Sequence, residues 1–211
     1  MNGILALVIA YFLGGIPFGY LLVKLASGKD VRTEGSGNIG ATNALRAGGP
    51  AVGIATLLLD AGKGYLAVWL AALLTNESAA WMSAAALAVI AGHAFPVFLK
   101  GQGGKSVATY AGAFLYLTPL PAVAAMAVFI ITVAVTRHIS AGSVLAAGTS
   151  PIGVWMIQHP PAAVLLASVF ASCFVVYRHK SNLERLRAGT ESTFTWKHAA
   201  GGPVRQVWRH R

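Results

Sequence analysis

The sequence predicts an all-α membrane protein, a bundle of about seven transmembrane helices with its N-terminus outside and its C-terminus in the cytoplasm. Three observations support this fold class. The 211 residues are 56% hydrophobic and only 10% charged, whereas a soluble domain averages about 25% charged residues. The apolar residues form long runs, which is typical of membrane spans. The Lys and Arg residues are confined to alternate connections between these runs, which indicates a sidedness.

Seven apolar segments can be counted along the chain. They are Gly3–Ala26, Ala51–Leu74, Ala79–Leu99, Ser106–Leu117, Ala122–Thr136, Ala141–Ile157 and Ala162–Tyr177. A spanning helix needs about 20 residues, and roughly 17 at the lower limit. Because the fourth, fifth and seventh segments fall short of this length, an alternative is that residues 106–136 form one long helix instead of two.

The positive charges decide between these alternatives. The chain carries 16 Lys and Arg residues and a formal net charge of +10. Apart from Lys63, they lie at the ends of the first, third, fifth and seventh segments or in the connections that follow, and none lies in TNESA, TPLP or QHPP. Positive residues mark the cytoplasmic side, so Lys105 and Arg137 belong on one side and TPLP turns the chain on the other. Pro119 and Pro121 suit this turn because proline lacks a backbone N–H donor.

Residues 1–191 are predicted to form a single integral membrane domain, because the chain has no long linker and no soluble domain. Residues 192–211, STFTWKHAAGGPVRQVWRHR, are predicted to be a basic cytoplasmic tail. Trp196 and Trp208 among its positive charges suit an anionic membrane surface, while the alternative is a disordered tail without a role. The single cysteine, Cys173, lies within an apolar run and is interpreted as a small apolar residue.

Polar residues gather in the connections on the predicted cytoplasmic side. The stretches are residues 35–50, GSGNIGATNALRAGGP, residues 92–109, GHAFPVFLKGQGGKSVAT, residues 177–191, YRHKSNLERLRAGTE, and the smaller TRHISAGS at 136–143. Glycine clusters let backbone N–H groups turn toward an anion, and the start of a helix adds its positive dipole end. In GQGGKS, Lys105 adds a point charge and Ser106 a hydroxyl donor. Glycines in membrane proteins mostly indicate close helix packing, but two such loops, each with a cation and hydroxyls, favour phosphate binding.

Two ionisable residues within the predicted spans call for an explanation. Asp60 and Lys63 lie three residues apart in the second segment and therefore share one helical face. Such a pair usually faces the bundle interior or a watery cavity. Two interpretations stay open, a structural ion pair that joins helices and a direct role with the substrate. His93, near the cytoplasmic end of the third segment, is either a buried polar residue between helices or a cavity-lining residue, since Pro96 favours a kink there.

The third polar stretch is predicted to be a helix that leaves the membrane. Arg178, Asn182 and Arg185 recur at i, i+4 and i+7 and share one face, with His179 beside it. The alternative is a basic juxtamembrane helix whose long side chains reach the lipid headgroups.

Several chemistries lack their sequence signatures. No G-x-S-x-G elbow occurs, and GQGGKS lacks the spacing of a Walker A loop. Only six acidic residues exist, widely scattered, and no Cys, His and Asp cluster has metal-ligand spacing, so metal catalysis is not expected. Lys and Arg residues confined to short loops indicate lipid headgroups or a phosphorylated substrate as partners, and not nucleic acid.

The three large polar stretches together resemble the three motifs of the bacterial membrane-integral, acyl-phosphate-dependent glycerol-3-phosphate acyltransferases. The resemblance extends from residue 1 to about residue 191 and includes the spacing of the spans. Two small departures are Leu183, where the family has Ile after the asparagine, and Ser106, where glycine is frequent. The family transfers a fatty acyl group from acyl phosphate to the 1-hydroxyl of glycerol 3-phosphate, giving lysophosphatidic acid and phosphate in phospholipid biosynthesis. It uses no coenzyme A, no cofactor and no metal.

The resemblance also implies roles for individual residues. The implied catalytic residues are Ser36, Arg46, Lys105, His179 and Asn182. The implied substrate-binding residues are Gly37, Asn38, Thr42, Asn43, Lys63, His93, Gly103, Gly104, Ser106 and Ser143. The expected location is the bacterial inner membrane, in contact with lipid and with the active site facing the cytoplasm.

The residues alone leave two other classes open. One is a transporter for a small anion or phosphate ester, whose broken helices and glycine loops would look much the same. The other is a structural membrane subunit. The gathering of polar residues at one surface favours an enzyme that takes one substrate from water and one from lipid.

Overall fold

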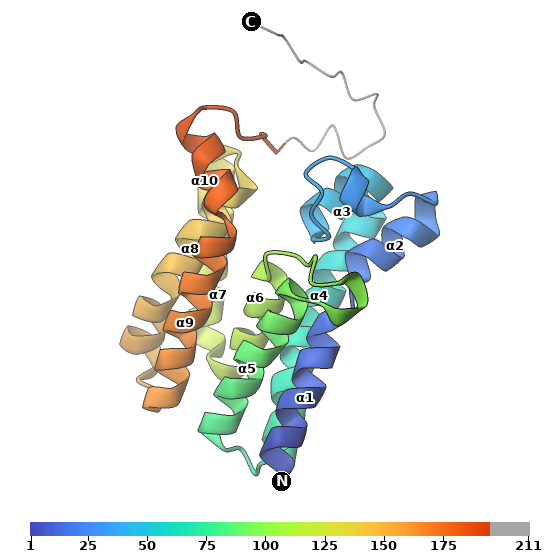
Figure 1. The fold of residues 1–211 in the computed structure, drawn as a ribbon. Coiled ribbons are helices and arrows are strands. Elements are labelled where there is room, and N and C mark those ends of the chain that lie inside the picture. The colour runs from blue at the N-terminus through green and yellow to red at the C-terminus, as the bar shows by residue number, and fades with distance from the viewer. Residues whose placement is uncertain (195–211) are drawn as a thin grey trace, which may run out of the picture.

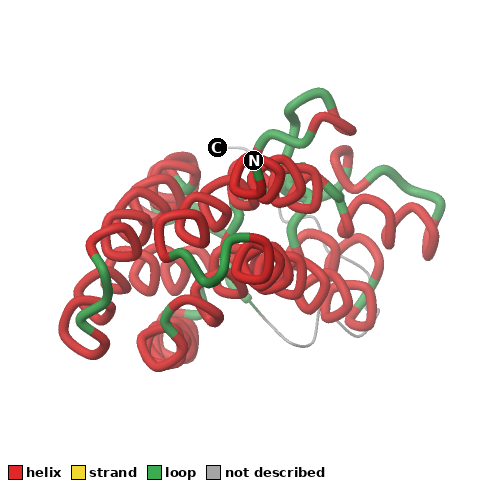
Figure 2. The backbone as a smooth tube through the Cα atoms, turned by 90° about the horizontal axis from the view of Figure 1, so that it is seen from below, coloured by secondary structure: helices red, strands yellow, loops and turns green. Residues whose placement is uncertain are grey.

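The computed structural model describes residues 1–194, and this part of the chain is built from helices joined by short loops (Figure 1 and Figure 2). The α-helices are α1 (Asn2–Gly15), α2 (Phe18–Ser27), α3 (Ala41–Gly48), α4 (Pro50–Leu74), α5 (Ala79–Ala94), α6 (Val107–Leu117), α7 (Pro119–Thr136), α8 (Ile139–Gly153), α9 (Ala162–Arg178) and α10 (Lys180–Arg187). Two short 3₁₀ turns, η1 (Val31–Thr33) and η2 (Val97–Leu99), and a π-helical turn, η3 (Val154–Gln158), complete the described elements. The predicted all-helical class is confirmed.

Within residues 1–194, five helices are long and apolar enough to cross a membrane: Asn2–Ser27, Pro50–Leu74, Ala79–Leu99, Pro119–Thr136 and Ile139–Gln158. A sixth is counted if α9 and α10, which are bent by 55° relative to each other, form one span. The short helix α6 has only 11 residues. The several apolar spans agree with a multi-pass membrane protein, whereas the count of seven and the sidedness of the two termini stay predictions.

Proline residues mark the places where the predicted segments break. The first segment consists of two helices, because Pro17 lacks a donor and separates α1 from α2. Residues 106–136 form two helices, and the break lies at Thr118, just before Pro119 at the start of α7. Pro151 lies inside α8, and the helix continues beyond it as the π-helical turn η3.

Small residues let the central helices pack closely. Gly14 and Gly92 lie where α1 meets α5, and Gly64 and Gly112 lie where α4 meets α6. A Cβ atom on any of these four glycines would overlap a backbone carbonyl group of the facing helix. Membrane helices associate through such close contacts, because lipid provides no hydrophobic force that drives helices together. The glycines therefore let α1 pack closely on α5 and α4 on α6, and α4 also packs on α1 and α5, so that the four helices form one group.

Helices α7 and α8 form a second group that packs less closely on the first. Only 6% of the 18 residues of α7 are buried, and this helix packs mainly against α8. The polar connections lie at the end of the bundle opposite the N-terminus, where Figure 1 places α2, α3 and α10. We call this end the polar end.

The sidedness can be tested by cysteine labelling in a Cys173→Ala background. We expect single cysteines at the exposed residues Glu77 and Gln158 to react with an impermeant thiol reagent from outside the cell, because no Lys or Arg lies in their connections. Cysteines at the exposed residues Lys100 and Lys180, at the polar end, should react only after the cytoplasmic side is opened. Labelling of Lys100→Cys in intact cells would contradict the predicted orientation.

Candidate functional site

A cavity of about 500 Å³ opens at the polar end and runs between the two groups of helices. This volume is within the range of small-molecule sites, about 300–1,000 Å³. Its deeper wall is mostly apolar and is formed by residues of α4, α6, α7 and α8, namely Leu57, Ala108, Ala111, Phe114, Ala122, Ala125, Met126, Phe129, Val133, Ala146 and Ala147. The cavity therefore joins a polar mouth to an apolar interior that reaches into the level of the spans.

Most of the predicted site residues meet at this mouth. Those that line the cavity are Ser36, Asn38, Thr42, Asn43, Arg46, His93, Lys105, Ser106, Ser143, His179 and Asn182. Gly37, Lys63, Gly103 and Gly104 do not line it. Three polar stretches that lie far apart in the sequence are thus brought to one site, as the sequence indicated.

The first polar stretch is organised around the side chain of Asn43. Its amide nitrogen lies 2.9 Å from each of three carbonyl oxygens, those of Val31, Glu34 and Asn38. Its Oδ1 accepts a hydrogen bond from the backbone N–H of Ser36 at 3.0 Å. Only 2% of Asn43 is exposed. Its hydrogen-bonding groups therefore shape the loop, and the hydroxyl of Ser36 is held at the surface beside the mouth.

Arg46 lies one turn further along α3 and carries a positive charge at the mouth. Its Nη2 donates to the Ser192 hydroxyl at 2.9 Å. Burial lowers the pKa of Arg46, while Glu191 opposes this shift; the guanidinium nevertheless stays protonated at neutral pH. The contact with Ser192 brings the start of the predicted tail, residues 192–194, to the mouth. The rest of that tail lies outside the described residues, so the proposed cytoplasmic tail stays a prediction.

The second polar stretch is a glycine loop that rests on His93. The N–H of Gly104 donates to the His93 carbonyl oxygen at 3.1 Å. A Cβ on Gly103 or Gly104 would overlap the backbone or the ring of His93, so no larger residue fits this approach. The Ser106 hydroxyl donates to the Ile90 carbonyl at 2.9 Å and is buried, so its donor is used within the helix bundle.

Lys105 projects from the glycine loop toward the third stretch, where Nζ donates to Asn182 Oδ1. The pKa of Lys105 is lowered to about 8, mainly by burial. Glu191 opposes this shift, and the charges of Arg185, Arg178 and Arg46 add to it. A lysine ammonium surrounded by cations and partly removed from water gains much from a bound anion. Lys105 is therefore well placed to bind phosphate.

The third polar stretch bends at His179. The prediction of one continuous helix is wrong here, because α9 ends at Arg178 and α10 starts at Lys180 with a 55° change of direction. As a consequence Arg178 does not share a face with Asn182 and Arg185. His179 Nδ1 lies 2.7 Å from the Val175 carbonyl and donates to it, which leaves Nε2 as an acceptor. Burial lowers the pKa of His179 to about 4, so the ring is neutral at pH 7.

Glu191 connects the side chains of the third stretch. Asn182 Nδ2 donates to its Oε1 at 2.6 Å, Arg185 Nε donates to its Oε2 at 2.7 Å, and the Ser140 hydroxyl donates to Oε1 at 2.8 Å. Burial raises the pKa of Glu191, but these hydrogen bonds outweigh burial and leave the pKa below its ordinary value. An ionised carboxylate thus fixes Asn182 and Arg185 at the mouth.

Sequence reasoning did not assign Ser140, Arg185, Glu191 or Ser192 to the site, although all four line the cavity. A signal existed for three of them. Glu191 and Arg185 belong to the third quoted stretch, and Ser140 belongs to TRHISAGS. Ser192 carries no distinguishing pattern. Among the described residues, no group of three or more His, Cys, Asp or Glu side chains is placed to hold a metal ion.

The two ionisable residues of α4 form a buried network below the mouth. Lys63 Nζ lies 2.8 Å from Asp60 Oδ1 and donates to the Ile16 carbonyl at 2.8 Å. His93 Nδ1 lies 3.5 Å from Asp60 Oδ1 and 3.2 Å from the Thr109 hydroxyl. Of the two interpretations of the pair, the geometry favours the structural one for Lys63, whose ammonium is held between α4 and the break after α1.

Comparison with known proteins identifies the family. The family model described as glycerol-3-phosphate acyltransferase matches residues 4–189. The glycerol-3-phosphate acyltransferase of Trichlorobacter lovleyi is 51% identical over 187 residues, covering 88% of this chain and 94% of the relative. That of Geobacter sulfurreducens is 45% identical and covers 92% of this chain and 98% of the relative. The chain belongs to the glycerol-3-phosphate acyltransferase family.

Solved structures of the family have the same fold. The glycerol 3-phosphate form of PlsY (YgiH), described as an integral membrane glycerol 3-phosphate acyltransferase, matches with a TM-score of 0.89 and 31% identity, covering 96% of this chain and all of that chain. Its lysophosphatidic acid form matches with a TM-score of 0.84 and 30% identity, covering 95% and 99%. The resemblance of the three motifs is confirmed, and the transporter and structural-subunit classes are set aside. The acyltransferase is a multi-pass membrane protein of phospholipid synthesis.

The depressed pKa of Lys105 can be measured without an activity assay. We expect competitive acetylation, read by mass spectrometry, to show half-maximal reactivity of Lys105 near pH 8, below the ordinary lysine value of 10.5, because burial and neighbouring cations disfavour the ammonium. Inorganic phosphate should move the midpoint upward, and Glu191→Gln should move it downward. A midpoint near the ordinary value in the absence of anions would contradict the electrostatics of the mouth.

Proposed function

We propose that the protein transfers a fatty acyl group from acyl phosphate to the 1-hydroxyl of glycerol 3-phosphate, giving lysophosphatidic acid and inorganic phosphate. The family defines the acceptor and the reaction class; the acyl-phosphate donor and the hydroxyl are the proposed parts. The single observation that carries the proposal is the cavity itself. A mouth with three cations, Arg46, Lys105 and Arg185, leads into an apolar interior between α4, α6, α7 and α8.

The charges at the mouth suit a donor and an acceptor that both carry phosphate. Three cations face one mouth carboxylate, that of Glu191, so the mouth has positive charge in excess. Arginine and lysine bind phosphate through charge-assisted hydrogen bonds, which are about twice as strong as neutral ones. The hydroxyls of Ser36 and Thr42 have no internal partner among the described residues and supply further donors. Asn43 contributes by shaping the loop that carries Ser36.

The apolar interior suits the acyl chain. It is formed by side chains of four helices at the level of the spans, and α7 on its outer side is largely exposed to lipid. An acyl chain can therefore enter from the membrane while the phosphate end reaches the polar mouth. We place this mouth on the cytoplasmic side of the bacterial inner membrane, where the positive residues gather.

The chemical step needs one nucleophile and one proton acceptor. The glycerol 1-hydroxyl oxygen attacks the acyl carbonyl carbon, the bond from that carbon to the phosphate oxygen breaks, and inorganic phosphate leaves. An acyl phosphate is a mixed anhydride with a good leaving group, so positioning and electrostatics suffice without an enzyme nucleophile. We assign Arg46 and Lys105 to the phosphates, Ser36 to the reacting oxygens, and His179 and Asn182 to orientation of the hydroxyl.

The proton has two acceptors within the proposed site. One is the phosphate of glycerol 3-phosphate, whose second pKa is about 6. The other is Nε2 of His179, which can accept a proton because Nδ1 donates its hydrogen to the Val175 carbonyl. The depressed pKa of His179, about 4, makes its ring a weak base. We therefore propose that the substrate phosphate takes the proton and that His179 positions the hydroxyl.

Purified protein should convert acyl phosphate and radiolabelled glycerol 3-phosphate into a labelled lipid. Arg46→Ala and Lys105→Ala should each lower kcat/KM by about 10²-fold or more, because each removes a charge-assisted phosphate contact from a partly dry site. The matched control is Lys100→Ala, an exposed lysine of the preceding turn, which should keep wild-type activity. Turnover with an acyl thioester and none with acyl phosphate would refute the proposed donor.

The proton acceptor can be identified with the phosphonate analogue of glycerol 3-phosphate, whose second pKa is higher. With saturating substrates, the acidic limb of the pH–rate profile should move upward with the analogue, because the phosphonate must lose its proton before it can accept another. The same limb should keep its position in His179→Asn, at a lower rate. If the acidic limb keeps its position with the analogue and disappears in His179→Asn, the histidine is the base.

A further inference from the structure

The glycine loop at residues 101–104 carries Lys105 but has no side chains that could fix it apart from that of Gln102. Glycine has the largest conformational freedom of any residue, so an ordered glycine loop needs external contacts. Two glycine carbonyl groups of this loop meet one cation from another helix. We propose that Arg178 is a positioning residue, whose guanidinium holds the carbonyls of Gly103 and Gly104 and thereby sets the place of Lys105 at the mouth.

The contacts of Arg178 define the clamp. Its Nη2 donates to the Gly104 carbonyl at 2.9 Å and lies 3.3 Å from the Gly103 carbonyl. Its guanidinium carbon lies 5.4 Å from the centre of the Phe95 ring, within the range of a cation–π contact. Phe95 therefore supports the guanidinium, and the charge is directed at the loop.

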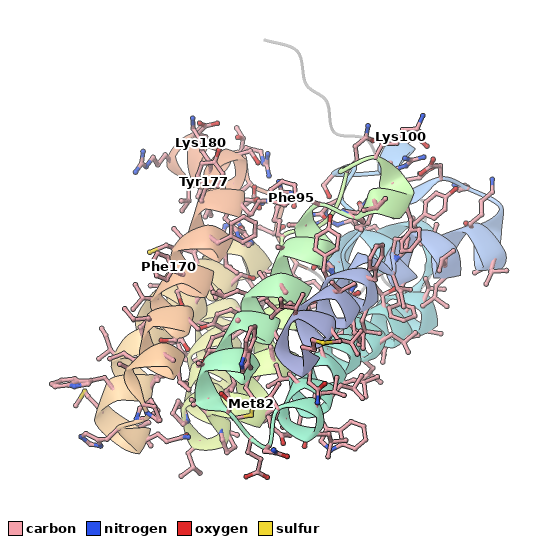
Figure 3. The ribbon with its side chains drawn as sticks, turned by 60° about the horizontal axis from the view of Figure 1, so that its bottom comes forward. Met82, Phe95, Lys100, Phe170, Tyr177 and Lys180 are labelled. Atoms are coloured by element: carbon pink, nitrogen blue, oxygen red, sulfur yellow. The ribbon has the colours of Figure 1, made fainter. Side chains whose placement is uncertain are left out.

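Phe95 belongs to the same contact region as the end of α9. Figure 3 shows Phe95 between the bend from α9 to α10, where Tyr177 and Lys180 are labelled, and the loop that carries Lys100. The ring of Phe95 lies 5.9 Å from that of Phe174, one turn before Arg178. The residues that join α5 to α9 thus place the guanidinium beside the glycine loop.

The loop is held from its other side by His93. The Gly104 N–H donates to the His93 carbonyl, and both Gly103 and Gly104 lie so close to His93 that no Cβ would fit. His93 is itself held by Asp60 and by Thr109. This contact fixes how deep the loop sits but uses an N–H group of the loop. Arg178 satisfies the carbonyl groups of Gly103 and Gly104. The Gly103 carbonyl belongs to the same trans peptide unit as the Gly104 N–H, so it points away from His93.

The clamp and the site are mechanically coupled through the bend between α9 and α10. Arg178 is the last residue of α9, and Asn182, which accepts from Lys105, lies in the first turns of α10. One bend thus holds both the loop that carries Lys105 and the group that orients its ammonium. Arg178 itself does not line the cavity among the described residues, so it acts through Lys105 and does not touch the substrate.

The first measurement uses the full chain in lipid nanodiscs and rests on the proposed function. We expect Arg178→Gln to raise the KM for glycerol 3-phosphate by about tenfold or more with a smaller change in kcat, because the loop that carries Lys105 loses its charge-assisted hydrogen bonds. Arg178→Lys should recover part of the loss, since lysine keeps the charge but not the planar fork. The matched control, Lys180→Gln, removes an exposed cation two residues away and should keep the wild-type KM.

The second measurement reports on the loop without any activity. A spin label on Gln102→Cys, an exposed loop position, in a Cys173→Ala background should become more mobile in Arg178→Gln and stay unchanged in Lys180→Gln. A label that stays equally immobile in Arg178→Gln overturns the clamp, and a raised KM with an unchanged label would mean that Arg178 binds substrate directly. If the wild-type protein transfers no acyl group, the proposed function fails while the label still decides the clamp.

Discussion

The site depends on one constraint, the need to satisfy the backbone groups of irregular loops that lie at the edge of a membrane. A loop without secondary structure exposes N–H and C=O groups, and each one left unpaired in a dry environment is costly. In the first loop the side chain of Asn43 meets this need, because its amide nitrogen contacts three backbone carbonyl oxygens and its Oδ1 accepts a hydrogen bond from one backbone N–H. In the second loop, the His93 carbonyl accepts from the Gly104 N–H, and Arg178 donates to the carbonyls of Gly103 and Gly104. The loops are therefore ordered without regular hydrogen-bond ladders, and their remaining hydroxyls and cations are left for a ligand.

Couplings between the loops make the three stretches one site. Lys105 of the second stretch meets Asn182 of the third, and Arg46 of the first meets Ser192, directly beyond Glu191. Glu191 binds Arg185 directly and reaches Lys105 through Asn182, so a single carboxylate connects two of the cations of the mouth. The arrangement holds like charges close together at an electrostatic cost, which a bound phosphate would relieve.

The sequence predicted the class of fold and the meeting of the polar stretches because both follow from strong, local signals. Long apolar runs and the asymmetry of Lys and Arg locate the helices and place the loops on one side. The break at Pro17 was not predicted, because the apolar run Gly3–Ala26 keeps its hydropathy across a change of direction. The bend at His179 was not predicted, because the residues on both sides of it have helical spacing. The role of Glu191 was missed for a related reason. In the sequence, Glu191 stands at the end of a basic stretch and resembles a solvent-exposed charge. In the structure, it lies beside Ser140, whose hydroxyl donates to it.

The buried network of α4 shows why ionisable residues within spans are ambiguous in a sequence. Asp60 and Lys63 share a helical face, as their spacing indicates, but they differ in what they reach. Lys63 binds the Ile16 carbonyl, which lies at the break between α1 and α2 and also accepts from the Phe18 N–H. Asp60 lies at the cavity wall and supports His93, on which the glycine loop rests. A break in one helix is thus satisfied by a cation of the next, and the counterion of that cation supports the loop that carries Lys105. A polar residue far from the reacting groups can therefore contribute to the site, because its hydrogen bonds hold the backbone on which the mouth residues are placed.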